Sequence, residues 1–394
     1  MAKKGIFGAI ASWLRLQLGG GSVIFRVIKA IGYFLLGLWG LINRISPRNL
    51  AYNLFPPQTP DFPGYVTVVD LNGLSGVAFR TNETEPAMVD LLLDGVRINR
   101  TWASQKVTFP SRYHGSGDGF YFPMKRVWSQ VPRAAKLEVM VGGSALRYGA
   151  GYGPGKALPN LGPKVIKGKS IVELSSKGFL ITKFGRIQEP VNEAGPWIDK
   201  TFGGYVELNS IFEKVTGKSM FAFYGVMLGY AREGGVLAHD MDLDLAYFSE
   251  LESPEKVKAE FLEISRILAG AGLDFMPHSY KLQFRRYNLS LTPCWISAGK
   301  FSCTFGYVGG DFSVNKGDIL PLKTVEHGRY QLLLPNNPQA VAAYLYGQGW
   351  KYPDPGWKWL PEYKNRPDIL AARLNDADLK ELNILIASSN KQGG

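Results

Sequence analysis

Three aspartates alternate with apolar residues in one short stretch of this sequence. Residues 225–248 read GVMLGYAREGGVLAHDMDLDLAYF, and Asp240, Asp242 and Asp244 stand at every second position in it. Side chains two residues apart on a β-strand point the same way, so the spacing predicts a row of carboxylates on one face of a strand. The apolar residues among them are expected to point the other way, into a core: Met241, Leu243 and Leu245.

Carboxylates in such a row repel one another, and their pKa values rise unless a cation neutralises them. Carboxylate oxygens are hard ligands that favour magnesium or manganese over zinc. The row therefore predicts a site for Mg²⁺ or Mn²⁺. The alternative is a solvated strand edge on which the alternation has no chemical role.

The cysteines and histidines do not form a second motif. Cys294 and Cys303 are the two cysteines of the chain, too few for a disulfide framework and without a partner at zinc-ligand spacing. We expect them to be ordinary buried thiols. The four histidines are scattered along the sequence, which argues against a zinc site: His114, His239, His278 and His327.

The stretch around the aspartates resembles the signature of the LicD/fukutin phosphotransferases, members of the polymerase-β-like nucleotidyltransferase superfamily. That signature runs Gly-Thr-Leu-Leu-Gly, an Arg three residues on, a Gly, and then Trp-Asp-Asp-Asp-Ile-Asp. The positions in register here are Gly225, Leu228, Gly229, Arg232, Gly235, Asp240, Asp242 and Asp244. Residues 320–355 are similar to the closing segment of the family, from a Pro-Leu-Lys to a Tyr-Gly-x-x-Trp that here begins at Tyr346. The resemblance covers residues 170–360, about half of the chain.

The sequence also departs from the family pattern. Val226 stands where a Thr is usual, and Met241 replaces the middle Asp of the run. Residues 288–303, NLSLTPCWISAGKFSC, look like a family strand that carries a third metal-binding carboxylate, and Ser290 occupies that place. Either the three aspartates hold the metal alone, or the activity is weak or lost, or another acid takes part: Asp311, Asp318 or Glu326.

The resemblance implies transfer of a phospho-alcohol from a CDP-linked donor to a sugar hydroxyl of a cell-surface or lipid-linked glycan. The transferred group would be of the ribitol phosphate, glycerol phosphate or phosphocholine type. In this interpretation Asp242 and Asp244 hold Mg²⁺ or Mn²⁺ against the donor pyrophosphate, and Asp240 accepts the proton of the attacking hydroxyl. The catalytic and metal-binding set is thus Asp240, Asp242 and Asp244.

Four further positions are expected to contact donor phosphate: Gly225, Gly229, Arg232 and Lys323. For Arg232 the alternative is a structural salt bridge to the aspartates, and for Lys323 it is a solvated surface position. His239 is more simply a packing residue than a catalyst, and the role of Ser290 stays open.

Two other functions are compatible with the same residues. The first is plain nucleotidyl transfer, although the Gly-Ser element of typical nucleotidyltransferases is missing. The second is an inactive membrane scaffold or glycan-binding protein, which Ser290 makes plausible. Nucleic-acid binding is not expected, because beyond the N-terminal segment the Lys and Arg residues are dispersed and no recognition motif is present.

The elements that must position these residues form an α+β fold. We expect a nucleotidyltransferase-like mixed sheet with flanking helices over residues 165–375, followed by a C-terminal helix and tail over 376–394. Short apolar runs with turn signals predict a small β-sandwich over 62–149, with a hairpin turn at Asp94-Gly95. Residues 206–217 and 253–273 carry helical periodicity, the second with Ser253 as its N-cap and Pro254 after it.

The N-terminal segment, residues 1–55, is basic and apolar. The net charge of the chain is +12, and the first acidic residue is Asp61. Amphipathic helices lying on an anionic membrane surface fit this composition. The alternatives are a helical pair packed on the core of the protein and a true membrane span from Val23 to Ile42. We expect a peripheral protein at the cytoplasmic face of a bacterial inner membrane.

Overall fold

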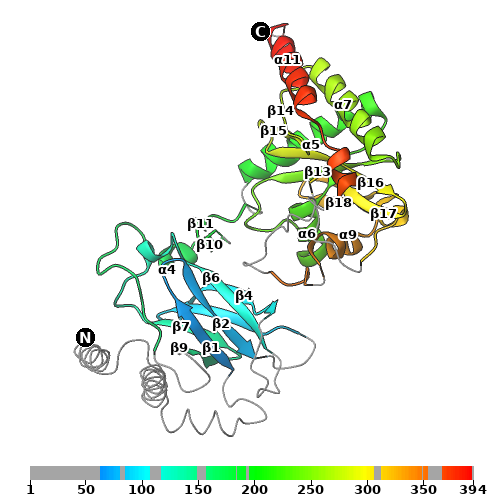
Figure 1. Cartoon of the computed structure of the whole chain (residues 1–394). Coiled ribbons are helices and arrows are strands. Elements are labelled where there is room, and N and C mark those ends of the chain that lie inside the picture. Colours follow the sequence, from blue (N-terminus) through cyan, green and yellow to red (C-terminus); the bar gives the residue numbers. More distant parts are fainter. Residues whose placement is uncertain are drawn as a thin grey trace, which may run out of the picture.

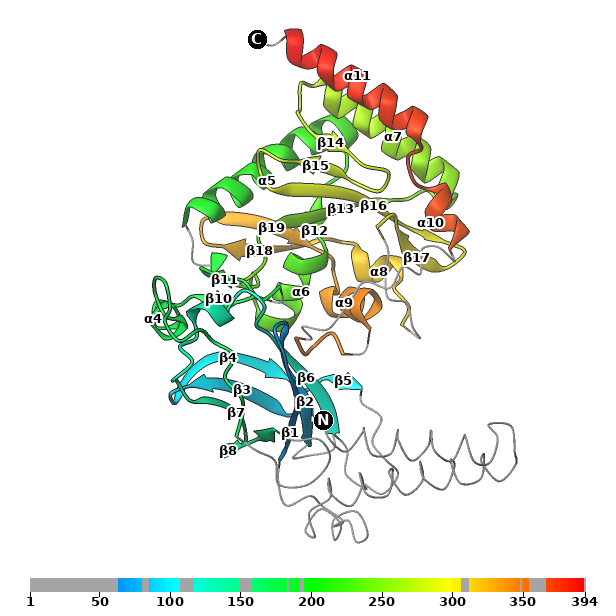
Figure 2. The same ribbon diagram turned by 60° about the vertical axis from the view of Figure 1, so that its left-hand side comes forward.

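The computed structural model describes residues 63–79, 85–106, 117–148, 157–182, 184–191, 195–305, 312–347, 349–353 and 366–392. These residues form an α+β fold, as predicted, with a β-sandwich and an α/β unit above it in Figures 1 and 2. The N-terminal segment for which membrane contact is expected, residues 1–55, lies outside the described residues. Within the described part of the chain, no helix is both long and apolar enough to cross a membrane.

The sandwich consists of two sheets that share one hydrophobic core. The first has the order β5-β6-β2-β1-β9, and its strands are Gln105–Lys106, Gly117–Pro123, Gly73–Phe79, Gly64–Val69 and Arg147–Tyr148. The second has the order β4-β3-β7-β8, with strands Val96–Trp102, Met88–Leu93, Leu137–Val141 and Ser144–Ala145. Alternate residues of β3 and β7 are buried, as the period of a half-buried strand requires.

The predicted hairpin turn at Asp94-Gly95 is confirmed, because it joins β3 to β4 and both residues have positive φ (50° and 80°). The same pair of strands contains a bulge. Leu91 pairs with Asn99 but Leu92 pairs with Arg97, so one residue of β4, Ile98, is extra. A bulge shifts the alternation of the strand that carries it and re-aims its side chains.

The segment after the sandwich packs on it and then leads to the α/β unit. Its elements are the short helix α4 (Ile171–Ser175) and a hairpin of β10 (Leu180–Ile181) and β11 (Ile187–Gln188). Ile171 lies in the sandwich core, and Ile181 and Ile187 pack against that core. Residues of this segment therefore pack with the sandwich, and the first helix of the α/β unit, α5, begins at Gly195.

The α/β unit is built on a six-stranded sheet. Its order is β12-β13-β16-β15-β14, with β17 also paired to β16; the strands are Phe221–Ala222, Leu243–Ser249, Leu289–Ser297, Leu282–Phe284, Met276–Pro277 and Lys300–Cys303. The β13 and β16 strands are parallel and the other pairs antiparallel, so the sheet is mixed. A separate hairpin comprises β18 (Lys323–His327) and β19 (Tyr330–Leu334).

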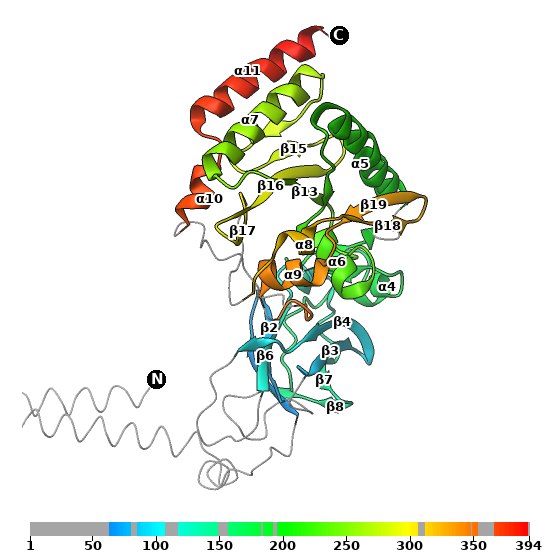
Figure 3. The same ribbon diagram turned by 90° about the vertical axis from the view of Figure 1, so that its right-hand side faces the viewer.

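Helices cover both faces of this sheet. On one face, the core includes residues of α5 (Gly195–Thr216), α7 (Pro254–Gly270) and α11 (Asp376–Gln392). On the other, it includes residues of α6 (Tyr224–Glu233), α8 (Lys316–Ile319) and α9 (Pro338–Tyr346). In Figure 3 this second group lies between the sheet and the sandwich. The short helix α10 spans Pro367–Ala371 and precedes α11.

Local sequence signals set the ends of the helices around the sheet. The α7 helix starts where predicted, with the Ser253 hydroxyl accepting a hydrogen bond from the Lys256 amide and Pro254 at the first turn. The α5 helix ends before Gly217 and α6 ends at Gly234, and both glycines have positive φ (68° and 74°). The predicted C-terminal helix is confirmed, and its Leu382 and Ile386 belong to the core of the α/β unit.

Candidate functional site

The predicted strand of three aspartates is wrong in part. The β13 strand begins at Leu243, so Asp244 lies in the strand and Asp240 and Asp242 lie in the loop before it. The reason is that the neighbouring strand, β16, begins only at Leu289, opposite Leu243, and earlier residues have no strand to pair with. The expectation that Met241 points into the core is wrong too, since Met241 is 54% exposed.

The rest of the strand follows the predicted alternation. Leu243 and Leu245 are fully buried in the core that faces α5 and α7. Asp244 points to the opposite face, where it pairs with Ser290 of the parallel strand β16. The Ser290 hydroxyl donates a hydrogen bond to the Asp244 carboxylate. Ser290 thus lies beside Asp244 on the neighbouring strand.

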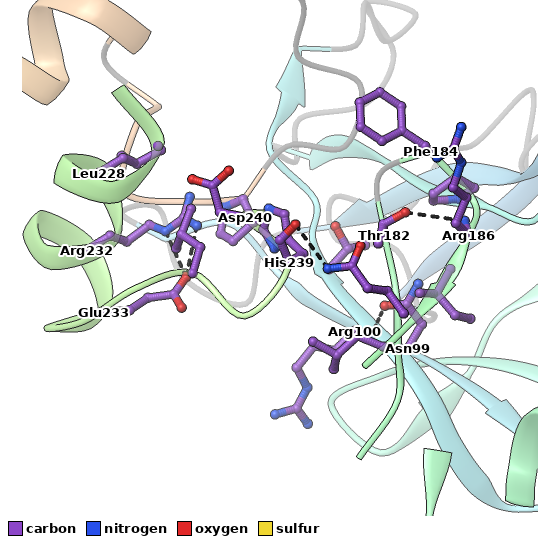
Figure 4. A pocket seen from close by; sticks show the side chains of 18 of the residues that line it. Asn99, Arg100, Thr182, Phe184, Arg186, Leu228, Arg232, Glu233, His239 and Asp240 are labelled. Atoms are coloured by element: carbon purple, nitrogen blue, oxygen red, sulfur yellow. Dashed lines mark hydrogen bonds and ion pairs between the residues drawn. The ribbon is translucent and has the colours of Figure 1, made fainter. Parts of the chain in front are cut away.

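A cleft of about 1550 Å³ lies between the α/β unit and the sandwich. Six of the predicted site residues line it: Gly225, Arg232, His239, Asp240, Asp242 and Asp244. In Figure 4, Arg232, His239 and Asp240 lie on one side of this pocket and Arg100 and Arg186 on the other. Gly229, Ser290 and Lys323 are not among the lining residues.

The Asp244 carboxylate has a raised pKa, about 6, and burial is the main cause. The negative charge of Asp242 raises this pKa further, so the two carboxylates lie close enough to repel each other. The hydrogen bond from Ser290 and the positive charge of Lys281 act in the opposite direction. Lys281 was not predicted as a site residue, because its proximity to Asp244 depends on a turn that precedes β15.

Tyr346, at the end of α9, is a second site residue that sequence reasoning missed. It lines the cleft, and its pKa lies well above the usual value, mainly through burial. The charges of Asp240, Asp244 and Asp242 raise this pKa, and that of Arg232 lowers it. All four groups are therefore near the phenol. The signal in the sequence was its place in the Tyr-Gly-x-x-Trp that resembles the family pattern.

The two glycines of the predicted phosphate-binding set make room for protein atoms. A Cβ at Gly225 would lie 2.0 Å from Oδ2 of Asp240, so this glycine lets the carboxylate approach the first turn of α6. A Cβ at Gly229 would lie 2.4 Å from the carbonyl oxygen of Gly235, where the following loop crosses the helix. Gly225 therefore shapes the site, and Gly229 packs the loop against α6.

The cationic candidates differ in their surroundings. The Arg232 side chain is only 9% exposed and forms an ion pair with Glu233 at 2.9 Å, not with the aspartates. Lys323 is exposed on β18, away from the cleft lining, which favours the solvated-surface interpretation. His239 is exposed in the aspartate loop, at the edge of the cleft.

Three hydrogen bonds fasten the loop that carries Asp240 and Asp242. The Val191 amide donates to the carbonyl of residue 238 at 2.9 Å, and Gln188 Nε2 donates to that of residue 239 at 3.4 Å. Trp197 Nε1 donates to the carbonyl of residue 241 at 3.0 Å. The donors lie on β11, on the segment after it and at the start of α5, so the loop takes its position from elements outside the sheet.

The other acids considered as replacements for a third carboxylate do not lie in the cleft. Asp318 forms a capping box with Asn315 at the start of α8, and Glu326 is exposed on β18. Asp311 lies outside the described residues. Over the described ranges, no group of three His, Cys, Asp or Glu side chains is arranged to hold a metal ion. The candidate metal ligands of the site are therefore the carboxylates of Asp242 and Asp244, while the carboxylate of Asp240 lies beside Gly225 in the first turn of α6.

No model of a protein family matches the chain, and no curated protein matches it.

Proposed function

We propose that this chain is a metal-dependent phosphotransferase of the LicD/fukutin type, which moves a phospho-alcohol from a CDP-linked donor to a sugar hydroxyl. One observation carries the proposal: three carboxylates, one guanidinium and the Tyr346 phenol line the same cleft. Phosphoryl transfer depends mostly on positioning and charge neutralisation, which such a group supplies. A mixed sheet with helices on both faces is also compatible with a nucleotidyltransferase-like fold.

Mg²⁺ or Mn²⁺ fits the carboxylates of this wall in charge and in ligand type. Asp242 and Asp244 repel each other, and a cation beside them would favour the ionised form of both. The two carboxylates would supply some of the oxygen ligands of the ion, and donor phosphate oxygens and water would be suitable for the remainder. The ion, when bound, supplies neutralising charge to the donor pyrophosphate.

The reaction is a displacement at phosphorus. The acceptor hydroxyl oxygen forms a bond to the phosphorus that carries the alcohol, and the bond from that phosphorus to the bridging oxygen breaks. CMP leaves with the bridging oxygen. Asp240 accepts the proton of the hydroxyl, in a position fixed by the space beside Gly225. Arg232 adds positive charge in the cleft lining, and the positive charge of Lys281 acts on Asp244.

The proposal predicts that Asp242→Asn and Asp244→Asn each abolish metal-dependent release of CMP from a CDP-alcohol. The amide keeps the size of the side chain but loses the charge that holds the metal, which should cost at least about 3 kcal/mol of transition-state stabilisation, or more than a hundredfold in rate. Asp274→Asn, on an exposed turn after α7, is the matched control and should retain full activity. Residual activity above about a tenth in either site variant would exclude the metal assignment.

Ser290 favours one second candidate, a glycan-binding protein without turnover. Its hydroxyl, at the position of the family's third carboxylate, already satisfies one oxygen of Asp244. The same assay separates the two functions, since a binding protein would release no CMP with any CDP-alcohol or metal.

A further inference from the structure

The cleft has one wall that contains all of its lining acids together with Arg232, and one wall whose charged residues are all basic. Every acid belongs to the α/β unit, namely Glu233, Asp240, Asp242 and Asp244. The sandwich and the β10–β11 hairpin contribute arginines alone: Arg97, Arg100 and Arg186. A ligand that spans the cleft therefore meets positive charge at the end away from the aspartates.

The bulge in β4 brings two of these arginines to the cleft. Arg97 and Arg100 are three residues apart, and a regular strand would send their side chains to opposite faces. With Ile98 inserted as the extra residue, both are exposed and both line the cleft. Bulges are frequent where a strand must re-aim a side chain beside a binding site.

The three arginines differ in how far they are neutralised. Arg100 donates to both carboxylate oxygens of Asp90, at 2.6 Å and 2.9 Å. Within the described residues, the guanidinium groups of Arg97 and Arg186 form no ion pair or hydrogen bond. Guanidinium forks bind phosphate and carboxylate in a bidentate manner, and these two remain available for that.

The cleft is large enough for two ligands. Small-molecule pockets usually have volumes of about 300–1,000 Å³, whereas this cleft measures about 1550 Å³. A nucleotide-alcohol beside the aspartates leaves space along the sandwich wall. Phe184, 67% exposed at the tip of the hairpin, and Tyr121 of β6 add ring surfaces to this wall.

We propose that the sandwich wall binds an acceptor saccharide through an anionic group, a phosphate or a carboxylate, held by Arg97 and Arg186. This inference rests on the proposed function for the identity of the ligand as the acceptor. Without a metal ion the aspartate wall repels the anion by like charge, so the anion orients the saccharide with its far end toward the aspartates. The wall thus selects charged saccharides over neutral ones of the same length.

The test is a binding measurement on the full chain without donor or metal. Three oligosaccharides of equal length serve as probes: one neutral, one with a phosphate monoester and one with a uronic acid. We expect at least one anionic probe to bind tenfold or more tightly than the neutral one, with an advantage that shrinks as salt rises. The ranking of the two anionic probes identifies the group that the wall prefers.

The double variant Arg97→Gln/Arg186→Gln should lose that advantage. Arg147→Gln, an exposed arginine on β9 outside the cleft lining, is the matched control and should change it less than twofold. Equal affinity for the neutral and both anionic probes, or an advantage that survives the double variant, would overturn the proposal. The binding test measures no turnover, so it is independent of the CMP-release assay. If the chain binds anionic saccharides but releases no CMP, the proposed function is refuted and the present inference about the sandwich wall is not.

Discussion

Ser290 decides how much negative charge the site contains. The side chain is 5% exposed and its hydroxyl donates to Asp244, so a carboxylate in its place would lie against another carboxylate. Without a cation such a pair is destabilising, because burial and like charge both oppose ionisation. We therefore expect the strand pair to fold without metal, and binding of the proposed metal ion to depend on the donor phosphates.

Ser290→Asp should therefore make the stability of the fold depend on metal. We expect a lower melting temperature than wild type in a chelator, and a larger rise in Mn²⁺, because an ion that binds the native state alone stabilises it. Ser290→Asn, of the same shape but neutral, is the control and should be destabilised without the metal-dependent gain. Thermal unfolding with and without Mn²⁺ measures both. An equal Mn²⁺ shift in the two variants would place residue 290 outside the metal site.

At the scale of elements, the helices and the hairpin followed from local signals, and the aspartate loop did not. Ser253 with Pro254 predicted the start of α7, and Asp94-Gly95 predicted the β3–β4 turn, because caps and turns depend on a few adjacent residues. The alternation at residues 240–244 predicted one strand. The length of a strand depends on its partner, which can be distant in sequence. Here the pairing of β13 with β16 begins only at Leu243, so Asp240 and Asp242 are left outside the strand.

The site residues show the same division. The aspartates and Arg232 were predicted because they follow one another within a short stretch. Lys281 and Tyr346 come from elements far along the chain, and only the fold brings them to the aspartates. Lys323, predicted from a local resemblance, lies on a hairpin that the fold places away from the cleft lining.

The loop that carries Asp240 and Asp242 depends on Trp197, whose Nε1 donates to the carbonyl of residue 241. Trp197→Phe keeps the edge-on ring contact with Phe202 and removes the donor. We expect a loss of about 1 kcal/mol in the free energy of unfolding. We also expect CMP release to fall about tenfold, since errors of an ångström in positioning are costly in catalysis.

Trp128→Phe is a matched control for this change, because Trp128 Nε1 donates to the carbonyl of Asp70 at 3.1 Å in the sandwich, away from the cleft lining. It should cost similar stability and leave CMP release unchanged. Chemical denaturation and the release assay, run on both variants, separate stability from positioning. If both variants release CMP at the wild-type rate, the hydrogen bond to residue 241 has no part in the reaction.

At the scale of the whole molecule, the proposed chemistry lies in a cleft between two units. The basic N-terminal segment is expected to determine whether that chemistry takes place at a membrane surface. Seven basic residues precede the first acid, Asp61: Lys3, Lys4, Arg15, Arg26, Lys29, Arg44 and Arg48. Basic residues near an anionic bilayer each contribute about 1 kcal/mol to binding. A surface-bound enzyme would meet lipid-linked acceptors without having to capture them from solution.

Deleting residues 1–55 should therefore release the protein from anionic liposomes while CMP release with a soluble acceptor continues. The full chain should co-sediment with anionic liposomes, less so in high salt, and weakly with neutral ones, because the attraction is partly electrostatic.

The alternatives predict different results. A segment packed on the core would lower the melting temperature when deleted, and a membrane span would hold the full chain in neutral liposomes at any salt concentration. Co-sedimentation that persists after the deletion would locate the membrane contact in the two units themselves, where the arginines of the sandwich wall would be the first residues to examine.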